Sequence, residues 1–523
     1  MLGNLLVFAV GLSWIVNAVT IGPTGRLVIN NKRIAPDGFL RPSTLAGDTF
    51  PGPVIVGKKG DRFSINVTNH LTDPSMYRAT TVHWHGVFQN GTNWADGGAM
   101  VSQCPIVQNS SFLYDFQVFD QAGTFWYHSH YSQAVQYCDG LRGAFIVYDP
   151  QDPYKHLYDV DDESTIITLA DWYHLVTVQH PAQPVTTLIN GLGRTSAMDV
   201  NNTSTPLAVV NVTKGKRYRF RIIGLSCDSP YNFTIHHHNF TIIETDGEYT
   251  TPLDVDSLWV YAGQRYSVIM NADQPINNYW IRADPLSTRQ KAGFDSGRNS
   301  AILRYAGAPT EEPTTHAISK HPLNEVDLHN RNQKKPPGEP RLGGADIVIP
   351  IRQRYHDNNQ TFDINNVTFR PPTVPVLLQI LNGAFDIDHL MPKGSIYKLK
   401  ANSSVELQIY GLSRGGPHPY HLHGHAFYVV KEPYSNMFNW VNPVYRDTIN
   451  TGLDSNLTVI RFFTDNSGPW FLHCHIDWHI DMGLGIVFAE DPEGTKAHNK
   501  PIPPAFDKLC PDYEAHNPDK AYE

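Results

Sequence analysis

The sequence predicts an all-β protein built from sandwiches or barrels. Helical periodicity is scarce along its 523 residues, and short runs that alternate polar and apolar side chains take its place, as in residues 26–30, 217–223 and 405–410. In an extended strand such alternation places every second side chain on one face. Gly, Pro, Asn and Asp separate the runs, as the turns between short strands require.

A weak internal repeat indicates three domains. In each copy an aromatic strand leads through an irregular link to an apolar strand, as in the closing hairpin of a Greek-key barrel. The copies lie at residues 125–130 and 140–149, 279–284 and 301–306, and 470–475 and 483–491. The middle copy has Arg282-Ala283-Asp284 where its siblings have His-Ser-His and His-Cys-His. We therefore expect no metal ligands in the second domain.

Composition shifts give the expected boundaries. Residues 149–153 and the Pro- and charge-rich stretch from Pro309 to Pro322 are the candidate linkers. The predicted domains are residues 19–150, 151–320 and 321–523. If the first and third supply all metal ligands, the shared site lies between them, and the second acts as a spacer and as one wall of a substrate pocket.

The N-terminus indicates a secreted, extracellular protein. Residues 5–16 form an apolar run too short to span a bilayer, and residues 1–18 are the predicted signal peptide, although no Lys or Arg precedes the run. No second run of spanning length follows, so we expect no membrane partner. The net charge of -9 argues against a nucleic-acid partner. Asn-x-Thr sites at Asn66, Asn211, Asn232, Asn366 and Asn456 fit a secreted glycoprotein.

Four His-x-His pairs are the strongest chemical signal. They are His83 with His85, His128 with His130, His421 with His423, and His473 with His475. Residues i and i+2 of a strand project from the same face, so each pair can present two imidazoles to one metal cluster.

A second ligand set remains beside these pairs. His418, Cys474 and His479 provide two imidazoles and one thiolate, which is the ligand set of a blue-copper centre. Cys474 should point away from its neighbours His473 and His475, because alternate side chains of a strand face opposite ways. A short covalent path would then join the two sites and carry single electrons from one to the other.

These segments resemble the four copper signatures of the multicopper oxidases, and the chain is most similar to the secreted fungal laccases. The resemblance extends to residues 91–97 and 372–379 and covers nearly the whole mature chain. It implies three consecutive cupredoxin-like Greek-key domains and four copper ions. The implied type 1 ligands are His418, Cys474 and His479, and the type 2 ligands are His83 and His421. The implied type 3 ligands are His85, His128 and His475 on one ion, and His130, His423 and His473 on the other.

The resemblance also assigns roles to residues that bind no metal. Leu484 occupies the axial position of the type 1 site, where a Leu cannot coordinate and the reduction potential should therefore rise. Asp96 and Asp477 match acids near the trinuclear site, as proton relays or as supports for the ligand rings. Asp228 matches an acid in the substrate pocket beside His479, where an electron would enter. There it could take the proton that a phenol releases on oxidation.

The cysteine count fits an oxidising compartment. With Cys474 free to bind metal, Cys104, Cys138, Cys227 and Cys510 can form two disulfides in three possible connectivities. The resemblance implies the pairs Cys104–Cys510 and Cys138–Cys227.

The other histidines are interpreted as surface or structural residues, because a lone histidine seldom binds metal. They include the run His236–His238, although it looks like a metal tract, and also His156, His174, His180, His316, His321, His329, His356 and His516.

The expected function is that of an extracellular, monomeric laccase with phenols or aromatic amines and dioxygen as substrates. Four benzenediols and one dioxygen would give four benzosemiquinones and two waters, in lignin degradation and the detoxification of lignin-derived products. One alternative is a ferroxidase, which would need acidic residues around the type 1 site and usually a membrane anchor. The other is a non-catalytic copper carrier, which is disfavoured because all ten histidines and the cysteine are present.

Overall fold

The computed structural model describes residues 20–131, 135–178, 183–195, 205–286, 290, 292–294, 296–454 and 456–519. The predicted signal peptide, residues 1–18, and His180 lie outside these ranges. Within them the chain is mostly β, which confirms the predicted class. The alternating runs at residues 26–30, 217–223 and 405–410 lie inside strands β2, β13 and β24.

In the described residues, six sheets form three pairs, and each pair falls within one of the three predicted domain ranges. The first pair has the strand orders β1-β4-β9-β8-β6 and β3-β2-β5-β7. Its strands are β1 (Thr20–Ile21), β2 (Thr24–Ile34), β3 (Arg41–Ala46), β4 (Gly52–Lys58), β5 (Arg62–His70), β6 (Val82–His85), β7 (Ser111–Gln117), β8 (Gly123–Ser129) and β9 (Arg142–Tyr148).

The second pair has the orders β11-β10-β13-β18-β15-β16 and β12-β20-β19-β14-β17. Its strands are β10 (Ile166–Trp172), β11 (Thr186–Ile189), β12 (Val209–Val212), β13 (Arg217–Gly224), β14 (Tyr231–Ile235), β15 (Phe240–Thr245), β16 (Glu248–Val255), β17 (Ser257–Val260), β18 (Arg265–Asn271), β19 (Asn278–Pro285) and β20 (Ser300–Tyr305).

The third pair has the orders β22-β21-β24-β29-β26-β27 and β23-β31-β30-β25-β28. Its strands are β21 (Ile347–His356), β22 (Thr361–Ile364), β23 (Ile396–Leu399), β24 (Ser404–Tyr410), β25 (Pro419–Leu422), β26 (Phe427–Lys431), β27 (Tyr445–Arg446), β28 (Thr448–Asn450), β29 (Leu457–Phe463), β30 (Gly468–Cys474) and β31 (Gly485–Glu490). Its helices are α1 (Val376–Leu381), α2 (Asp477–Asp481), α3 (Pro492–His498) and α4 (Phe506–His516).

The repeat predicted from the sequence is visible as strand pairing. β8 pairs with β9, β19 with β20, and β30 with β31, each time antiparallel. These three hairpins occupy equivalent places in their sheets, because each also pairs on its outer side with a parallel strand, β4, β12 or β23. The three domains are therefore built on one plan.

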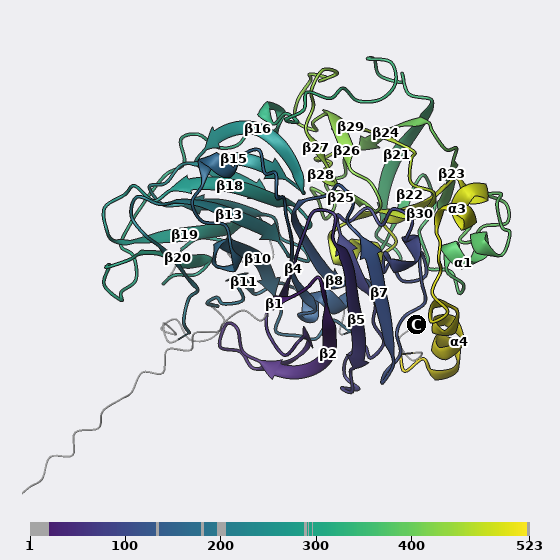
Figure 1. Ribbon diagram of the computed structural model, residues 1–523, viewed down its shortest axis with the longest axis horizontal. Coiled ribbons are helices and arrows are strands. Elements are labelled where there is room, and N and C mark those ends of the chain that lie inside the picture. Colours follow the sequence, from purple (N-terminus) through teal and green to yellow (C-terminus); the bar gives the residue numbers. More distant parts are fainter. Residues whose placement is uncertain are drawn as a thin grey trace, which may run out of the picture.

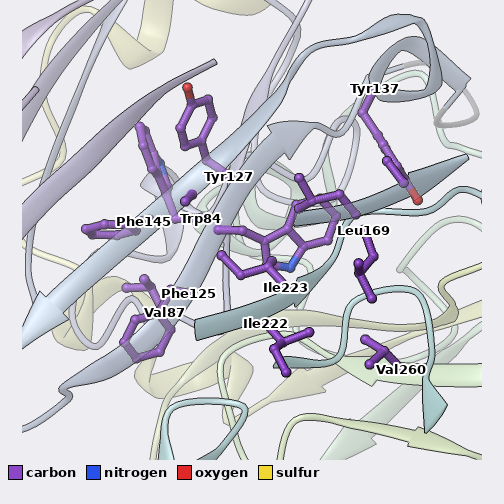
Figure 2. Close-up of a cluster of buried hydrophobic side chains, with 14 of the residues drawn as sticks. Trp84, Val87, Phe125, Tyr127, Tyr137, Phe145, Leu169, Ile222, Ile223 and Val260 are labelled. Atoms are coloured by element: carbon purple, nitrogen blue, oxygen red, sulfur yellow. The ribbon is translucent and has the colours of Figure 1, made fainter. Parts of the chain in front are cut away.

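The domains share one continuous apolar core. Figure 1 shows the second domain (teal) beside the first (purple to blue), with the third (green to yellow) against both. Figure 2 shows Trp84 and Phe145 of the first domain and Leu169 and Ile222 of the second in one cluster of buried side chains. Aromatic side chains bury large apolar areas, so this shared core holds the two domains firmly together.

Two disulfides cross between domains, and they are the pairs that the resemblance implied. Cys104–Cys510 joins the first domain to α4 near the end of the chain, and Cys138–Cys227 joins the first domain to the second. Cys474 is free and buried. In the described part of the chain, no helix has the length and apolar character needed to cross a bilayer.

Candidate metal centre

Two strand pairs, one in each outer domain, carry the His-x-His motifs. β6 pairs with β8 so that His83 lies opposite His128, and β25 pairs with β30 so that His421 lies opposite His473. Three of the second histidines come directly after a strand: His130 follows β8, His423 follows β25 and His475 follows β30. Each sheet thus presents four imidazoles, and the two sets meet at the boundary between the first and third domains.

The eight imidazoles form one buried cluster, called here the trinuclear site. Three triads each have their ligand atoms within 4.8 Å of one another: His83, His85 and His421; His85, His128 and His475; and His130, His423 and His473. In the last triad the Nε2 atom of His473 lies 3.3 Å from that of His130 and 3.1 Å from that of His423. A cation bound between these ring nitrogens would offset the repulsion of their lone pairs.

Hydrogen bonds fix which nitrogen of each ring is available. The Nδ1 atoms of His83, His421 and His473 lie 2.7, 3.0 and 3.0 Å from the backbone carbonyls of Asp96, Asp447 and Cys474. An N–H donated to a carbonyl leaves the opposite nitrogen with a free lone pair. The Nε2 atoms of His83, His128 and His421 are buried without a hydrogen-bond partner. A bound metal ion would satisfy them, so the residues present fit the coppers that the resemblance implies.

Burial favours the neutral form of the imidazoles at positions 85, 128, 130, 421, 423, 473 and 475, because it lowers the pKa of each. Desolvation lowers the pKa of His130 to about 3 and places the pKa of His85 and His475 well below the usual range. The neighbouring histidines add to this effect, because a second positive charge nearby disfavours protonation. Neutral imidazole is the form that binds metal, so the cluster is ready for ligation across the physiological pH range.

A second site, called here the mononuclear site, lies within the third domain. The Sγ atom of Cys474 is 3.4 Å from Nδ1 of His418 and 3.5 Å from Nδ1 of His479, and these two nitrogens are 3.1 Å apart. All three side chains are buried. One sulfur and two nitrogens in a triangle of this size match a blue-copper ligand set. As expected, Cys474 joins this group while His473 and His475 join the other.

Leu484 is fully buried in the strand connection beside the mononuclear site. Its backbone carbonyl accepts a hydrogen bond from the Cys474 N–H at 3.2 Å, and its own N–H donates to the His479 carbonyl at 2.9 Å. The backbone around Leu484 therefore holds the Cys474 and His479 main chain in place, while its side chain offers no donor atom.

The two predicted acids have opposite environments. Asp96 is buried with Oδ2 2.9 Å from Nδ1 of His423. Although desolvation opposes it, the facing rings of His423 and His83 lower the pKa of Asp96. Burial, together with the nearby carboxylates of Asp171 and Asp481, raises the pKa of Asp477 well above its usual range. Asp96 is thus held as a carboxylate and Asp477 as a neutral acid.

Asp228 is half-buried in the segment that follows β13. The carboxylate of Asp171 holds this segment, because it accepts the backbone N–H groups of Cys227 and Asp228 at 2.8 Å each and of Ser229 at 3.3 Å. The Cys227 carbonyl in turn accepts the Asp477 N–H at 2.9 Å. These contacts fix Asp228 next to the segment that carries His475 and His479.

Sequence reasoning missed three buried residues around the trinuclear site. Asp447 lies with Oδ1 3.3 Å from Nε2 of His85 and forms two hydrogen bonds with Arg265. The hydroxyl of Tyr137 lies 3.4 Å from Nδ1 of His475. The adjacent charges Arg446-Asp447 within an otherwise apolar and aromatic stretch were the one available signal, since such charges are buried only when paired.

Three of the lone histidines have structural partners. Nε2 of His174 lies 2.7 Å from Asp37, that of His238 2.7 Å from the Tyr305 hydroxyl, and that of His356 2.6 Å from Asp363. These partners agree with the interpretation of the three residues as non-ligands.

A cavity of about 680 Å³ reaches the trinuclear site from outside. It lies between the first and third domains, and its lining includes His130, Tyr131, Phe471, Arg370 and Tyr513. Small molecules can therefore approach His130 without passing the mononuclear site.

Comparison with known proteins gives the family. Multicopper oxidase family models match residues 28–152, 163–308 and 369–494. Curated relatives include a laccase of Trametes hirsuta, 52% identical over 98% of both chains, and a laccase of Pycnoporus cinnabarinus, 51% identical over 97% of both.

Solved structures agree with these matches. The laccase of Botrytis aclada has a TM-score of 0.81 and 29% identity, over 96% of this chain and 93% of that one. Fet3p, a multicopper oxidase that functions in iron import, has a TM-score of 0.81 and 28% identity over 95% of both chains. The predicted similarity to fungal laccases is confirmed, and this chain belongs to the multicopper oxidase family.

Proposed function

We propose that the protein is a secreted laccase that oxidises phenols or aromatic amines by one electron at a time and reduces dioxygen to water. The observation that carries the proposal is the pairing of two buried ligand sets through one tripeptide, His473-Cys474-His475. Each phenol gives up one electron and one proton, so four phenols supply the four electrons and four protons that convert one dioxygen into two waters.

The arrangement supports four copper ions. His418, Cys474 and His479 would hold the type 1 ion, and His83 and His421 the type 2 ion. His85, His128 and His475 would hold one type 3 ion, and His130, His423 and His473 the other. When bound, these ions supply the one-electron chemistry at the mononuclear site and the four-electron reduction of dioxygen at the trinuclear site.

The protein's own groups handle orientation and protons. Asp228 would accept the phenolic proton at its carboxylate while the substrate rests against His479, because losing an electron makes a phenol a strong acid. Asp477, held neutral by burial, would donate a proton toward the trinuclear site. Asp96 would orient His423 and His83 through its carboxylate and carbonyl. The cavity at His130 would admit dioxygen and release water.

The decisive experiment combines an absorption spectrum of the purified, copper-loaded protein with oxygen uptake across a panel of phenols. We expect an intense blue band from thiolate-bound copper and oxygen consumption with one dioxygen per four phenols. A copper-loaded protein that lacks the blue band would refute the proposal.

A parallel assay separates the ferroxidase alternative. Steady-state rates with Fe(II) and with a dimethoxyphenol, measured on the same preparation, should favour the phenol. A clear preference for Fe(II) would assign the protein to iron oxidation instead. Lignin degradation and the detoxification of its products are the physiological tasks that fit a phenol oxidase of this kind, and size-exclusion chromatography should give a monomer.

A further inference from the structure

None of the ligand triads named above draws on the middle domain, yet one turn of this domain touches the trinuclear site. Residues 261–264 connect β17 to β18, which begins at Arg265, and Gly263 lies at the centre of this turn, residues 261–265, with a φ of +85°. A Cβ atom on Gly263 would stand 2.9 Å from Cε1 of His85 and 3.0 Å from Cδ2 of His475. The backbone of the turn therefore packs directly against two imidazoles, at a distance that only glycine allows.

The same turn also holds the strand that positions His421. Arg265 donates two hydrogen bonds to the Asp447 carboxylate, at 2.8 and 2.7 Å. Gln264 Nε2 donates to the Thr448 carbonyl at 3.3 Å, and the Tyr261 hydroxyl accepts from Asn450 Nδ2 at 3.0 Å. Thr448 and Asn450 belong to β28, which pairs with β25 so that Thr448 lies opposite His421.

Asp447 connects Arg265 to two of the histidines of the trinuclear site. Its Oδ1 lies 3.3 Å from Nε2 of His85, and its backbone carbonyl lies 3.0 Å from Nδ1 of His421. An acceptor placed at one ring nitrogen fixes the tautomer and rotation of an imidazole, and so determines where the other nitrogen points. Arg265 is thus one residue removed from two ligands.

Within its own domain the turn is rigidly held. The Gly263 N–H donates to the Gly224 carbonyl, and the Gly224 N–H donates to the Gln264 carbonyl, both at 2.9 Å. Asp246 accepts the Arg265 N–H at 2.7 Å and the Arg446 Nε–H at 2.8 Å. Arg446, Asp246, Arg265 and Asp447 form a buried row of alternating charges across the domain boundary. Such a row tolerates little displacement, because any shift leaves a buried charge unpaired.

We infer that the turn 261–265 is a positioning element of the trinuclear site, by which the domain without copper ligands fixes His85, His421 and His475. The inference rests on the proposed function, since it assumes that these histidines hold copper. It gives the second domain a role at the dioxygen-reducing site, in addition to the spacer and pocket-wall roles expected from the sequence. Gly263 acts by close packing and Arg265 through Asp447.

The first test compares Gly263→Ala with Gly215→Ala. Gly215 has nearly the same backbone conformation, with a φ of +87°, but nothing lies within 4 Å of its added Cβ. Both variants share the backbone strain, and only the first pushes on the ligands. We expect Gly263→Ala to keep the blue band while its trinuclear site binds copper about 10–100-fold more weakly. The type 2 electron paramagnetic resonance signal should change, and Gly215→Ala should match the wild type in both respects.

The second test replaces Arg265 by lysine, which keeps the positive charge and removes the planar guanidinium that donates two hydrogen bonds to Asp447. Arg265→Lys cannot reach both Asp447 oxygens, whereas Arg461→Lys makes the same change at a buried arginine paired with Glu406 within the third domain. We expect the former alone to alter the type 2 signal and to raise the KM for dioxygen, while phenol bleaches the blue band under argon at the wild-type rate. This variant supplies the test if Gly263→Ala does not fold.

The outcomes distinguish a failure of the positioning role from a failure of the proposed function. If Gly263→Ala and Arg265→Lys match their controls in copper content, type 2 signal and dioxygen KM, the inference is overturned although the protein remains a laccase. If the copper-loaded wild type has no blue band, the proposed function itself fails, whatever the variants do.

Discussion

The mononuclear and trinuclear sites differ in how their ligands are drawn from the chain. His418 and His479 are 61 positions apart and lie in one domain, whereas His130 and His473 are separated by 343 positions and His85 and His475 by 390. The first site is thus a local property of the third domain. The second is a property of the interface and depends on every contact that docks the domains. Changes at the mononuclear site should therefore alter electron entry alone, and changes at the interface should alter dioxygen reduction.

The largest effect should come from Cys474→Ser. It removes the only soft ligand of the mononuclear site with almost no change of volume, so the blue band should vanish and phenol oxidation should fall by more than about 100-fold. The type 2 signal should persist, because the trinuclear imidazoles are untouched. Metal analysis with electron paramagnetic resonance checks this. Loss of copper from both sites would show that the two sites are not independent.

Asp477→Asn should act on the opposite site. An amide cannot donate an acidic proton, so dioxygen reduction should slow by about 100-fold or more, while phenol still bleaches the blue band under argon at the normal rate. The raised pKa of Asp477 keeps the proton-bearing form present below that pKa and removes it as pH rises through it. The rate of dioxygen reduction by the wild type should therefore decline with rising pH, and the variant should not show this decline. Stopped-flow reoxidation across pH decides, and an unchanged profile excludes Asp477 as the donor.

Asp228→Asn should affect the entry of electrons only when a proton travels with them. We expect kcat/KM for phenols to drop by about 10–100-fold, since the amide cannot accept the phenolic proton. A donor that loses an electron without a proton serves as the control and should be oxidised at the wild-type rate. If phenol oxidation and its pH profile stay as in the wild type, Asp228 has no part in proton transfer.

The smallest effect should follow Leu484→Met. A thioether near the mononuclear site can stabilise the oxidised ion and so lower the reduction potential, with a change in kcat below about tenfold. Leu407→Met is a matched control, because Leu407 is equally buried in β24 of the same domain. Redox titration of both variants checks the prediction, and a potential that is unchanged or higher in Leu484→Met contradicts it.

The sequence predicted what local patterns can encode. Period-two runs located β2, β13 and β24. The His-x-His spacing named the residues of the trinuclear site, and the remaining set of His418, Cys474 and His479 named those of the mononuclear site. It could not predict pairings between distant, individually ordinary residues. No local sequence pattern predicts that Gly263 packs against His85 or that Arg265 binds Asp447, because both contacts depend on how two domains dock. Helix α4 was also missed, since its single face is short and interrupted by Pro511.

The order of the ligands along the chain has a consequence for biosynthesis. Chains emerge from the ribosome N-terminus first, at about 5–20 residues per second, and domains fold as they appear. When the first domain is complete, it displays His83, His85, His128 and His130 with none of the partners that come from residues 421–475. Copper can then find only half a site. On the proposed ligand assignment, the trinuclear site can therefore fill only after residues 421–475 have emerged and folded.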